Sequence, residues 1–241
     1  MCGLCGDVNH DAGISRRRFL GTGAAALAAW SGLATAADPP KAGAPNAIPP
    51  SEALKRIMDG NARYVANTPS ERDFSAGRAA RAQGQAPIAG ILSCADSRVA
   101  PELVFDQAPG ELFVVRVAGN IVTTNLLASL EYGVQFLGTP LILVLGHSSC
   151  GAVDAAIKVV KTKAVLPGHL PELVTAIKPA AIIAEKTAPN NVLDFAIAEN
   201  VRRQVARLKD AAPIVGKAYK DKKIEIAGGV YDIASGKVTL V

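Results

Sequence analysis

The sequence predicts an α/β domain with a mainly parallel central sheet flanked by helices. Two short runs, residues 88–92 and 140–146, are apolar almost throughout, which is typical of strands buried on both faces of a sheet. Between and after these runs lie segments with the apolar spacing of helices, such as 123–138. Strands that alternate with helices indicate parallel strands joined by crossover helices. We therefore expect helices to cover both faces of the sheet.

The remaining elements are predicted from their local patterns. A strand is expected within residues 110–120, and a late strand, a turn and a final short strand within 223–241. Helices are expected at 51–67, 123–138, 150–162, 170–186 and 190–210. The first helix is expected to be interrupted near Gly60, and the second to end at Gly138, because glycine readily adopts the left-handed conformation that closes helices.

The composition indicates a globular protein with a substantial core. The chain has 241 residues, of which 49% are hydrophobic and 20% are charged, and this balance suits one folded domain with a tail. The net charge is only +5, without a block of like charges, and aromatic residues make up 5%. Nucleic-acid binding normally requires a basic face and stacking platforms, so we expect no nucleic-acid partner.

The first fifty residues are expected to be an export signal and a linker. Arg16 and Arg17 precede a weakly apolar run rich in alanine and glycine, which is similar to a twin-arginine export signal. Residues 34–36 form a small-x-small cleavage pattern. The predicted divisions are a twin-arginine signal peptide at 1–36, a proline-rich linker at 37–50 and a folded domain at 51–241.

This signal predicts export by the twin-arginine machinery to the periplasm or another site outside the cytoplasm. The alternative is a protein anchored in the membrane through an uncleaved signal. Cys2 and Cys5 form a C-x-x-C pair that could bind metal or cycle redox, but no strand and helix surround it. We therefore interpret this pair as a dispensable part of the signal. Cys94 and Cys150 are then the cysteines of the mature chain.

Two predicted strands end in residues that can bind a metal. Cys94 follows the run 88–92, and His147 follows the run 140–146, with Cys150 three positions later. Sites in parallel α/β sheets form at the carboxyl ends of the strands, so these side chains converge if the two strands are neighbours. Two thiolates and one imidazole are typical zinc ligands, and three protein ligands leave the open position of a catalytic zinc. We predict zinc at this site.

Asp96 and Arg98 follow Cys94 closely. Asp96 lies two residues after Cys94, on the same side of an extended segment, so its carboxylate can accept a proton from a zinc-bound water. Arg98 can hold that carboxylate by a bidentate pair and keep it off the metal. Without that pair Asp96 would become the fourth zinc ligand, which defines a closed state. An isolated Asp–Arg pair is usually a surface salt bridge of little energetic value.

These motifs resemble those of the β-class carbonic anhydrases. The similarity runs from about residue 51 to 241 and includes SCADSRVAPELVFDQAPGELFVVRVAGN, LVLGHSSCGAV and GGVYDIASGKV. The resemblance implies a β-carbonic anhydrase-like fold with one Zn²⁺ per subunit, held by the two cysteines and the histidine. It also implies a zinc lyase that hydrates carbon dioxide reversibly to bicarbonate and a proton. Zinc-bound hydroxide is then the nucleophile, and Asp96 and Arg98 form the catalytic dyad.

The resemblance further implies a set of residues around the substrate. Gln85 matches the catalytic glutamine that donates to the substrate oxygen. Phe113 and Tyr132 match pocket positions, and the backbone N–H of Gly151 matches a substrate donor. In this family Gln85 and Tyr132 can reach the active site across a dimer interface. A homodimer or a larger assembly is therefore implied.

Two alternatives stay open at this point. One is a hydrolase of carbonyl sulfide or carbon disulfide on the same fold, because the metal ligands do not discriminate between these gases and carbon dioxide. The other is a zinc-binding protein without catalysis. Asp96, Arg98 and Gln85 argue against the second alternative, because none of them is needed merely to hold zinc.

Overall fold

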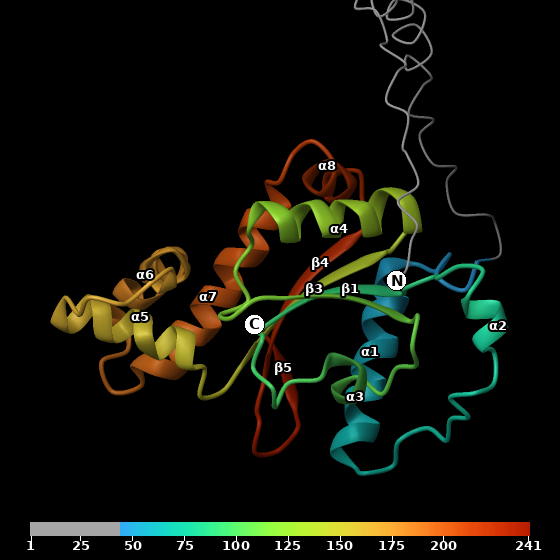
Figure 1. Cartoon of the computed structure of the whole chain (residues 1–241), viewed down its shortest axis with the longest axis horizontal. Helices are drawn as coiled ribbons and strands as arrows, with labels where there is room; N and C mark the ends of the chain where they lie inside the picture. Colours follow the sequence, from blue (N-terminus) through green and yellow to red (C-terminus); the bar gives the residue numbers. More distant parts are fainter. Residues whose placement is uncertain (1–43) are drawn as a thin grey trace, which may run out of the picture. The chain divides into compact units, whose positions relative to one another are not determined.

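The computed structural model describes residues 44–241, which form a five-stranded sheet with helices on both faces (Figure 1). The strand order is β2-β1-β3-β4-β5. The strands are β1 (Ala89–Ser93), β2 (Leu112–Arg116), β3 (Leu141–His147), β4 (Glu225–Tyr231) and β5 (Val238–Leu240). All neighbouring pairs are parallel except β4 and β5. The prediction of an α/β domain with a mainly parallel sheet is confirmed.

The helices of the described part include all five that the sequence predicts. They are α1 (Pro50–Val65), α2 (Arg78–Arg81), α3 (Pro101–Val104), α4 (Thr124–Leu137), α5 (Gly151–Thr162), α6 (Leu170–Thr187), α7 (Val192–Lys209) and α8 (Val215–Lys220). The short helices α2, α3 and α8 were not predicted, because four to six residues are too few to show a helical period. None of these helices combines the length and the apolar character that crossing a bilayer requires.

The expected interruption near Gly60 is wrong, because α1 continues through this residue to Val65. A Cβ atom at Gly60 would lie 1.8 Å from the carbonyl oxygen of Phe105, so any side chain here would collide with the backbone that follows α3. Glycine therefore serves a close approach of two segments, and the tertiary contact compensates for its poor helix propensity.

The strand β3 shows why its sequence is continuously apolar. Leu141, Leu143 and Leu145 pack on one face with α1 and α3, whereas Ile142 and Val144 pack on the other face with α4, α7 and α8. All five side chains are fully buried. Successive side chains of a strand point to opposite faces, so a strand covered on both sides has no position for a polar residue.

A third apolar cluster lies beside the sheet, where α5 and α6 pack together next to α7 at the left of Figure 1. Both Cys94 and Cys150 belong to this cluster, together with residues of all three helices. The two cysteines are therefore buried among small and branched apolar side chains. An apolar shell of this kind limits the access of bulk water to the sulfur atoms.

A buried carboxylate anchors the segment between α1 and β1. Asp106 accepts hydrogen bonds from Arg63 (2.6 Å), from the backbone and hydroxyl of Ser70 (3.1 and 2.8 Å) and from Arg72. Burial raises the pKa of Asp106, but the hydrogen bonds from these three residues outweigh burial and hold the pKa well below its usual range. The two arginines thus fix the course of the chain between α1 and α2.

The described chain begins inside the predicted linker. Asn46 is buried, and its side-chain amide donates to the carbonyl of Leu137 at 2.6 Å and to that of Pro87 at 3.3 Å. The last residues of the predicted linker thus pack on the domain. The predicted signal peptide at 1–36 and the rest of that linker lie outside the described residues.

Candidate metal and catalytic site

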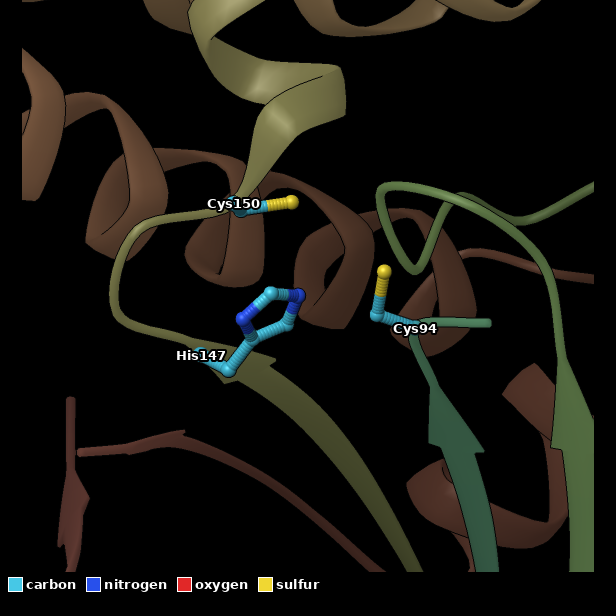
Figure 2. A group of neighbouring side chains, drawn as sticks. All are labelled: Cys94, His147 and Cys150. Atoms are coloured by element: carbon cyan, nitrogen blue, oxygen red, sulfur yellow. The ribbon is translucent and has the colours of Figure 1, made fainter. Parts of the chain in front are cut away.

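The two strands that end in candidate ligands are neighbours in the sheet. In β1 and β3, Ser93 pairs with Leu145, so the chain leaves both strands at the same edge. Figure 2 shows the two sulfur atoms and the imidazole pointing toward one shared space. The ligand atoms of Cys94, His147 and Cys150 all lie within 4.8 Å of one another, and the residues are 4%, 0% and 2% exposed. The convergence predicted from the strand ends is confirmed.

The backbone places Cys150 at the start of α5. Ser149 adopts a left-handed conformation with φ of 56°, which turns the chain so that Cys150 becomes the N-cap. The hydrogen bond between the two thiols lowers the pKa of Cys94 and raises that of Cys150, because the close pair shares one proton. Cys94 and Cys150 would hold a divalent cation in place of that proton, and the N–H groups of Ala152 and Val153 lower the pKa of Cys150 and so favour its thiolate.

The hydrogen bonds of His147 leave one ring nitrogen available as a ligand. Nδ1 donates to the carbonyl of Ser148 at 2.9 Å, whereas the buried Nε2 has no hydrogen-bond partner. This bond assigns the tautomer with a lone pair on Nε2. Ser148 is fixed in turn by bonds to Tyr231 and Ile233, each 2.9 Å long, at the end of β4. A buried unpaired nitrogen beside two thiols fits a zinc site, since zinc is bound by such a donor set.

Asp96 lies beside the ligands and is held by Arg98. Its Oδ1 accepts from the backbone N–H and from Nε of Arg98, both at 2.9 Å, and its Oδ2 accepts from Nη2 at 2.7 Å. These hydrogen bonds hold the pKa of Asp96 well below its usual range, against the opposing effect of burial. Oδ2 lies 3.9 Å from Nε2 of His147. The carboxylate is therefore anionic and adjacent to the ligands while Arg98 holds it.

Arg116 belongs to the same site, although sequence reasoning did not select it. Its Nε donates to the carbonyl of Cys94 at 2.9 Å, and its Nη2 donates to the carbonyl of Asp96 at 2.7 Å. Arg116 is the last residue of β2, which pairs with β1 along its whole length. It thus fixes the backbone between the metal ligand and the carboxylate. The signal that could have revealed it is a charged residue inside the segment 110–120, where a strand is predicted.

Gly151 lies at the site, but Gln85 does not. Gly151 is the first residue of α5, directly after Cys150, and helix geometry leaves its backbone N–H without an intrahelical partner. Gln85 is exposed and lies before the start of β1, at the opposite end of the strand from Cys94. The strand between them separates Gln85 from the ligands of its own chain.

Phe113 and Tyr132 form an aromatic surface patch, together with Phe136. Their ring centroids are separated by 6.2 Å for Phe113 and Tyr132 and by 5.2 Å for Tyr132 and Phe136. Tyr132 and Phe136 are 47% and 40% exposed. Phe113 pairs with Gly90, and the four steps along the strand from Gly90 to Cys94 span about 13 Å. These aromatic residues therefore do not line the metal site of their own chain.

The described domain is similar in sequence and fold to known proteins. Residues 89–238 match the family model described as carbonic anhydrase. Over 192 residues the chain is 36% identical to carbonic anhydrase 2 of Mycobacterium tuberculosis, covering 79% of this chain and 92% of that protein. The identity to the carbonic anhydrase of Mycolicibacterium smegmatis is 38% over 192 residues, covering 79% and 93%.

Solved structures give the same likeness. The β-carbonic anhydrase of Coccomyxa, solved with acetazolamide, is 29% identical with a TM-score of 0.61, and the match covers 79% of this chain and 85% of that one. A structure from a study of two tetrameric β-carbonic anhydrases of Sordaria macrospora is 25% identical with a TM-score of 0.62, covering 68% and 86%.

Proposed function

The chain belongs to the carbonic anhydrase family, and we propose that it is a β-class enzyme that hydrates carbon dioxide reversibly to bicarbonate and a proton. The observation that carries this conclusion is the buried cluster of Cys94, His147 and Cys150, whose donor set fits one zinc ion. Zinc held by these residues supplies a Lewis acid that activates water for attack on carbon dioxide.

Asp96 receives the proton of the attacking water at Oδ2. Oδ1 accepts two hydrogen bonds from Arg98, whereas Oδ2 accepts only one, so Oδ2 keeps a free lone pair near His147. The low pKa of Asp96 keeps the carboxylate anionic at neutral pH. A weak base of this kind orients the water and holds its proton only briefly. Because Asp96 is partly exposed, the proton then passes to solvent.

Arg98 and Arg116 keep this carboxylate in place from two sides. Arg98 binds both oxygens of the Asp96 side chain, which prevents the carboxylate from turning toward the zinc ligands. Arg116 binds the backbone carbonyls of Cys94 and Asp96. General-base catalysis requires hydrogen-bond reach, so this double support sets the distance between the carboxylate and the reacting water.

The two alternatives are not favoured. The curated relatives that match most of the chain are named carbonic anhydrases, which favours carbon dioxide over carbonyl sulfide and carbon disulfide as the substrate. A protein that merely stores zinc has no use for a carboxylate that Arg98 holds 3.9 Å from a ligand atom.

The proposed function is tested by zinc analysis and by activity assays with carbon dioxide, carbonyl sulfide and carbon disulfide. The full chain, purified with its metal, is expected to contain one zinc per subunit and to hydrate carbon dioxide in a stopped-flow assay across pH. Chelation of the zinc is expected to abolish this activity. A fully zinc-loaded chain that fails to hydrate carbon dioxide, or that turns over carbonyl sulfide or carbon disulfide faster, would contradict the proposal.

We also propose that the enzyme acts as a homodimer or a larger assembly. Support comes from the exposed aromatic patch of Phe113, Tyr132 and Phe136, because exposed aromatic clusters are typical of protein interfaces. Gln85 and Tyr132 lie far from the zinc ligands of their own chain, so a role near the substrate requires the site of a second copy. A study of related β-carbonic anhydrases describes tetramers.

Tyr132→Asp is expected to weaken this assembly and the activity together, because a charge would be buried in an apolar interface. Loss of an aromatic interface anchor costs about 2 kcal/mol or more, which raises the dimer dissociation constant at least ~30-fold. Sedimentation velocity, zinc analysis and the hydration assay measure the three readouts, and zinc content is expected to stay at one per chain. Val165→Asp is the matched control, since Val165 is 95% exposed between α5 and α6. A fully active wild-type monomer would refute the dimer.

Export is proposed from the sequence features alone. We infer that the twin-arginine machinery moves the chain out of the cytoplasm and that cleavage near residue 36 releases the mature protein. Support comes from Arg16, Arg17 and the small residues at 34–36. Cell fractionation tests this proposal: a chain shortened by residues 1–36 is expected outside the cytoplasm. The alternative, a membrane anchor that is never cleaved, would leave the full-length chain in the membrane fraction.

A further inference from the structure

A buried amide on α7 is linked to the sulfur of Cys94 through one residue of the loop between β2 and α4. The backbone N–H of Gly119 donates to Sγ of Cys94 at 3.3 Å. The carbonyl of the same glycine accepts from Nδ2 of Asn200 at 2.8 Å. Asn200 is 1% exposed, so no bulk water competes for this bond. The glycine whose N–H binds Sγ of Cys94 is therefore fixed by a side chain 81 residues later in the chain.

A second amide completes the support. Gln204 lies one helical turn after Asn200, and its Nε2 donates to Oδ1 of Asn200 at 3.2 Å. Its Oε1 accepts from the backbone N–H of Val122 at 2.9 Å. The two side chains thus bind the loop at Gly119 and again at Val122. Oδ1 of Asn200 and Oε1 of Gln204 each accept one hydrogen bond, and Nδ2 and Nε2 each donate one, so the buried pair is satisfied.

The loop itself has an unusual backbone that requires such support. Gly119 and the following Asn120 both have positive φ, at 76° and 44°. A Cβ atom at Gly119 would lie 2.5 Å from Cδ1 of Ile177 on α6 and 3.3 Å from Cβ of Ala152 on α5. Glycine adopts this conformation freely, but Asn120 has a Cβ atom and is less favourable there, so surrounding contacts help to maintain the loop.

Packing alone does not explain two amides at these positions. The same helix buries Ile197, Val201 and Leu208, and apolar residues at 200 and 204 would fill the same space. Asparagine is a poor helix former, and buried amides cost free energy unless they are hydrogen-bonded. The specific effect of the two amides is to fix the loop, and with it the N–H of Gly119 that donates to Sγ of Cys94. Hydrogen bonds to a ligand atom orient it and tune its affinity for the metal.

We propose that Asn200 and Gln204 are positioning residues for the zinc ligand Cys94, acting through the N–H of Gly119. By keeping this donor on the sulfur, they set how tightly Cys94 holds zinc. The inference rests on the proposed zinc site and deepens it. Removal of a residue that supports a metal ligand typically weakens metal binding about 10–100-fold, and we expect a loss of this size.

The experiment uses two variants of the full chain, Asn200→Ala and Gln204→Met. The methionine preserves the side-chain length, so Gln204→Met still tests the inference if Asn200→Ala does not fold. Zinc affinity is measured by competition with a chelator. The cobalt-substituted proteins report the sulfur ligands through the thiolate-to-cobalt charge-transfer band. Both variants are expected to bind zinc about 10–100-fold more weakly and to shift this band.

Leu208→Ala is the matched control, because this buried residue of α7 offers no hydrogen bond to the loop. It is expected to lower the thermal stability while leaving zinc affinity and the cobalt spectrum unchanged. Unchanged affinity and spectrum in Asn200→Ala and Gln204→Met would overturn the inference, and so would an equal loss in Leu208→Ala. A wild-type chain that binds no zinc would instead refute the proposed function.

Discussion

Replacing Cys150 with serine is expected to remove zinc binding and carbon dioxide hydration together. The serine hydroxyl is not ionised at neutral pH, so the site keeps one thiolate and one imidazole. Tight zinc sites with four ligands bind with about 10–16 kcal/mol, so one lost ligand costs on the order of 3 kcal/mol, or at least ~100-fold in affinity. The fold should persist, because residue 150 is the N-cap of α5 and serine is a favourable N-cap.

Zinc analysis, the hydration assay and circular dichroism on the same preparation measure this result. Cys5→Ser is the matched control, since the sequence places Cys5 in the predicted signal, and it is expected to retain both zinc and activity. A Cys150→Ser protein with one zinc per chain would show that Cys150 is not a ligand. A protein that retains zinc but loses activity would place Cys150 in a different role.

Asp96→Asn is expected to keep the zinc and lose the activity. The two side chains have the same shape, and Cys94, His147 and Cys150 are unchanged. The neutral amide, however, cannot take the proton of the attacking water, and one of its two positions is now a donor facing Arg98. General-base catalysis contributes about 10²–10⁴-fold, so kcat for hydration should fall by this factor.

The control for this variant removes the same charge at a surface position. Asp154 lies on α5 and forms an exposed pair with Lys158, so Asp154→Asn should leave kcat unchanged. Arg98→Ala should also impair hydration, because Asp96 loses its orientation. Residues that act as one unit are not additive, so the double variant should be no worse than Asp96→Asn alone. Wild-type turnover in Asp96→Asn would refute the role of the carboxylate.

Much of the fold and the ligand set follows from local patterns along the chain. The strand β3 is recognisable because burial on both faces excludes polar residues, and α4 because Thr123 and Gly138 cap its ends. His147 and Cys150 stand three positions apart at the end of that strand, so their proximity needs no long-range information. The meeting with Cys94 required one further inference, that β1 and β3 are neighbours.

The predictions about the N-terminal segment and the assembly concern parts that the described chain does not include. The signal peptide, the linker boundary and export lie largely outside residues 44–241, so they remain predictions from the sequence. The roles of Gln85, Phe113 and Tyr132 near the substrate also remain predictions, because they depend on a second copy of the chain.

The local sequence thus predicted the zinc, its candidate ligands and the carboxylate beside them, because each motif lies within a few neighbouring residues; the convergence of Cys94 with the other two ligands depended on the pairing of β1 with β3. The residues that support the site from other elements could be identified only in the folded structure. Gly60 was predicted to interrupt a helix, whereas the fold brings it against Phe105 within a continuous helix. Arg116 and Asn200 act across 22 and 81 residues. Contacts at such separations depend on how whole elements pack, and no local pattern of residue types records that packing.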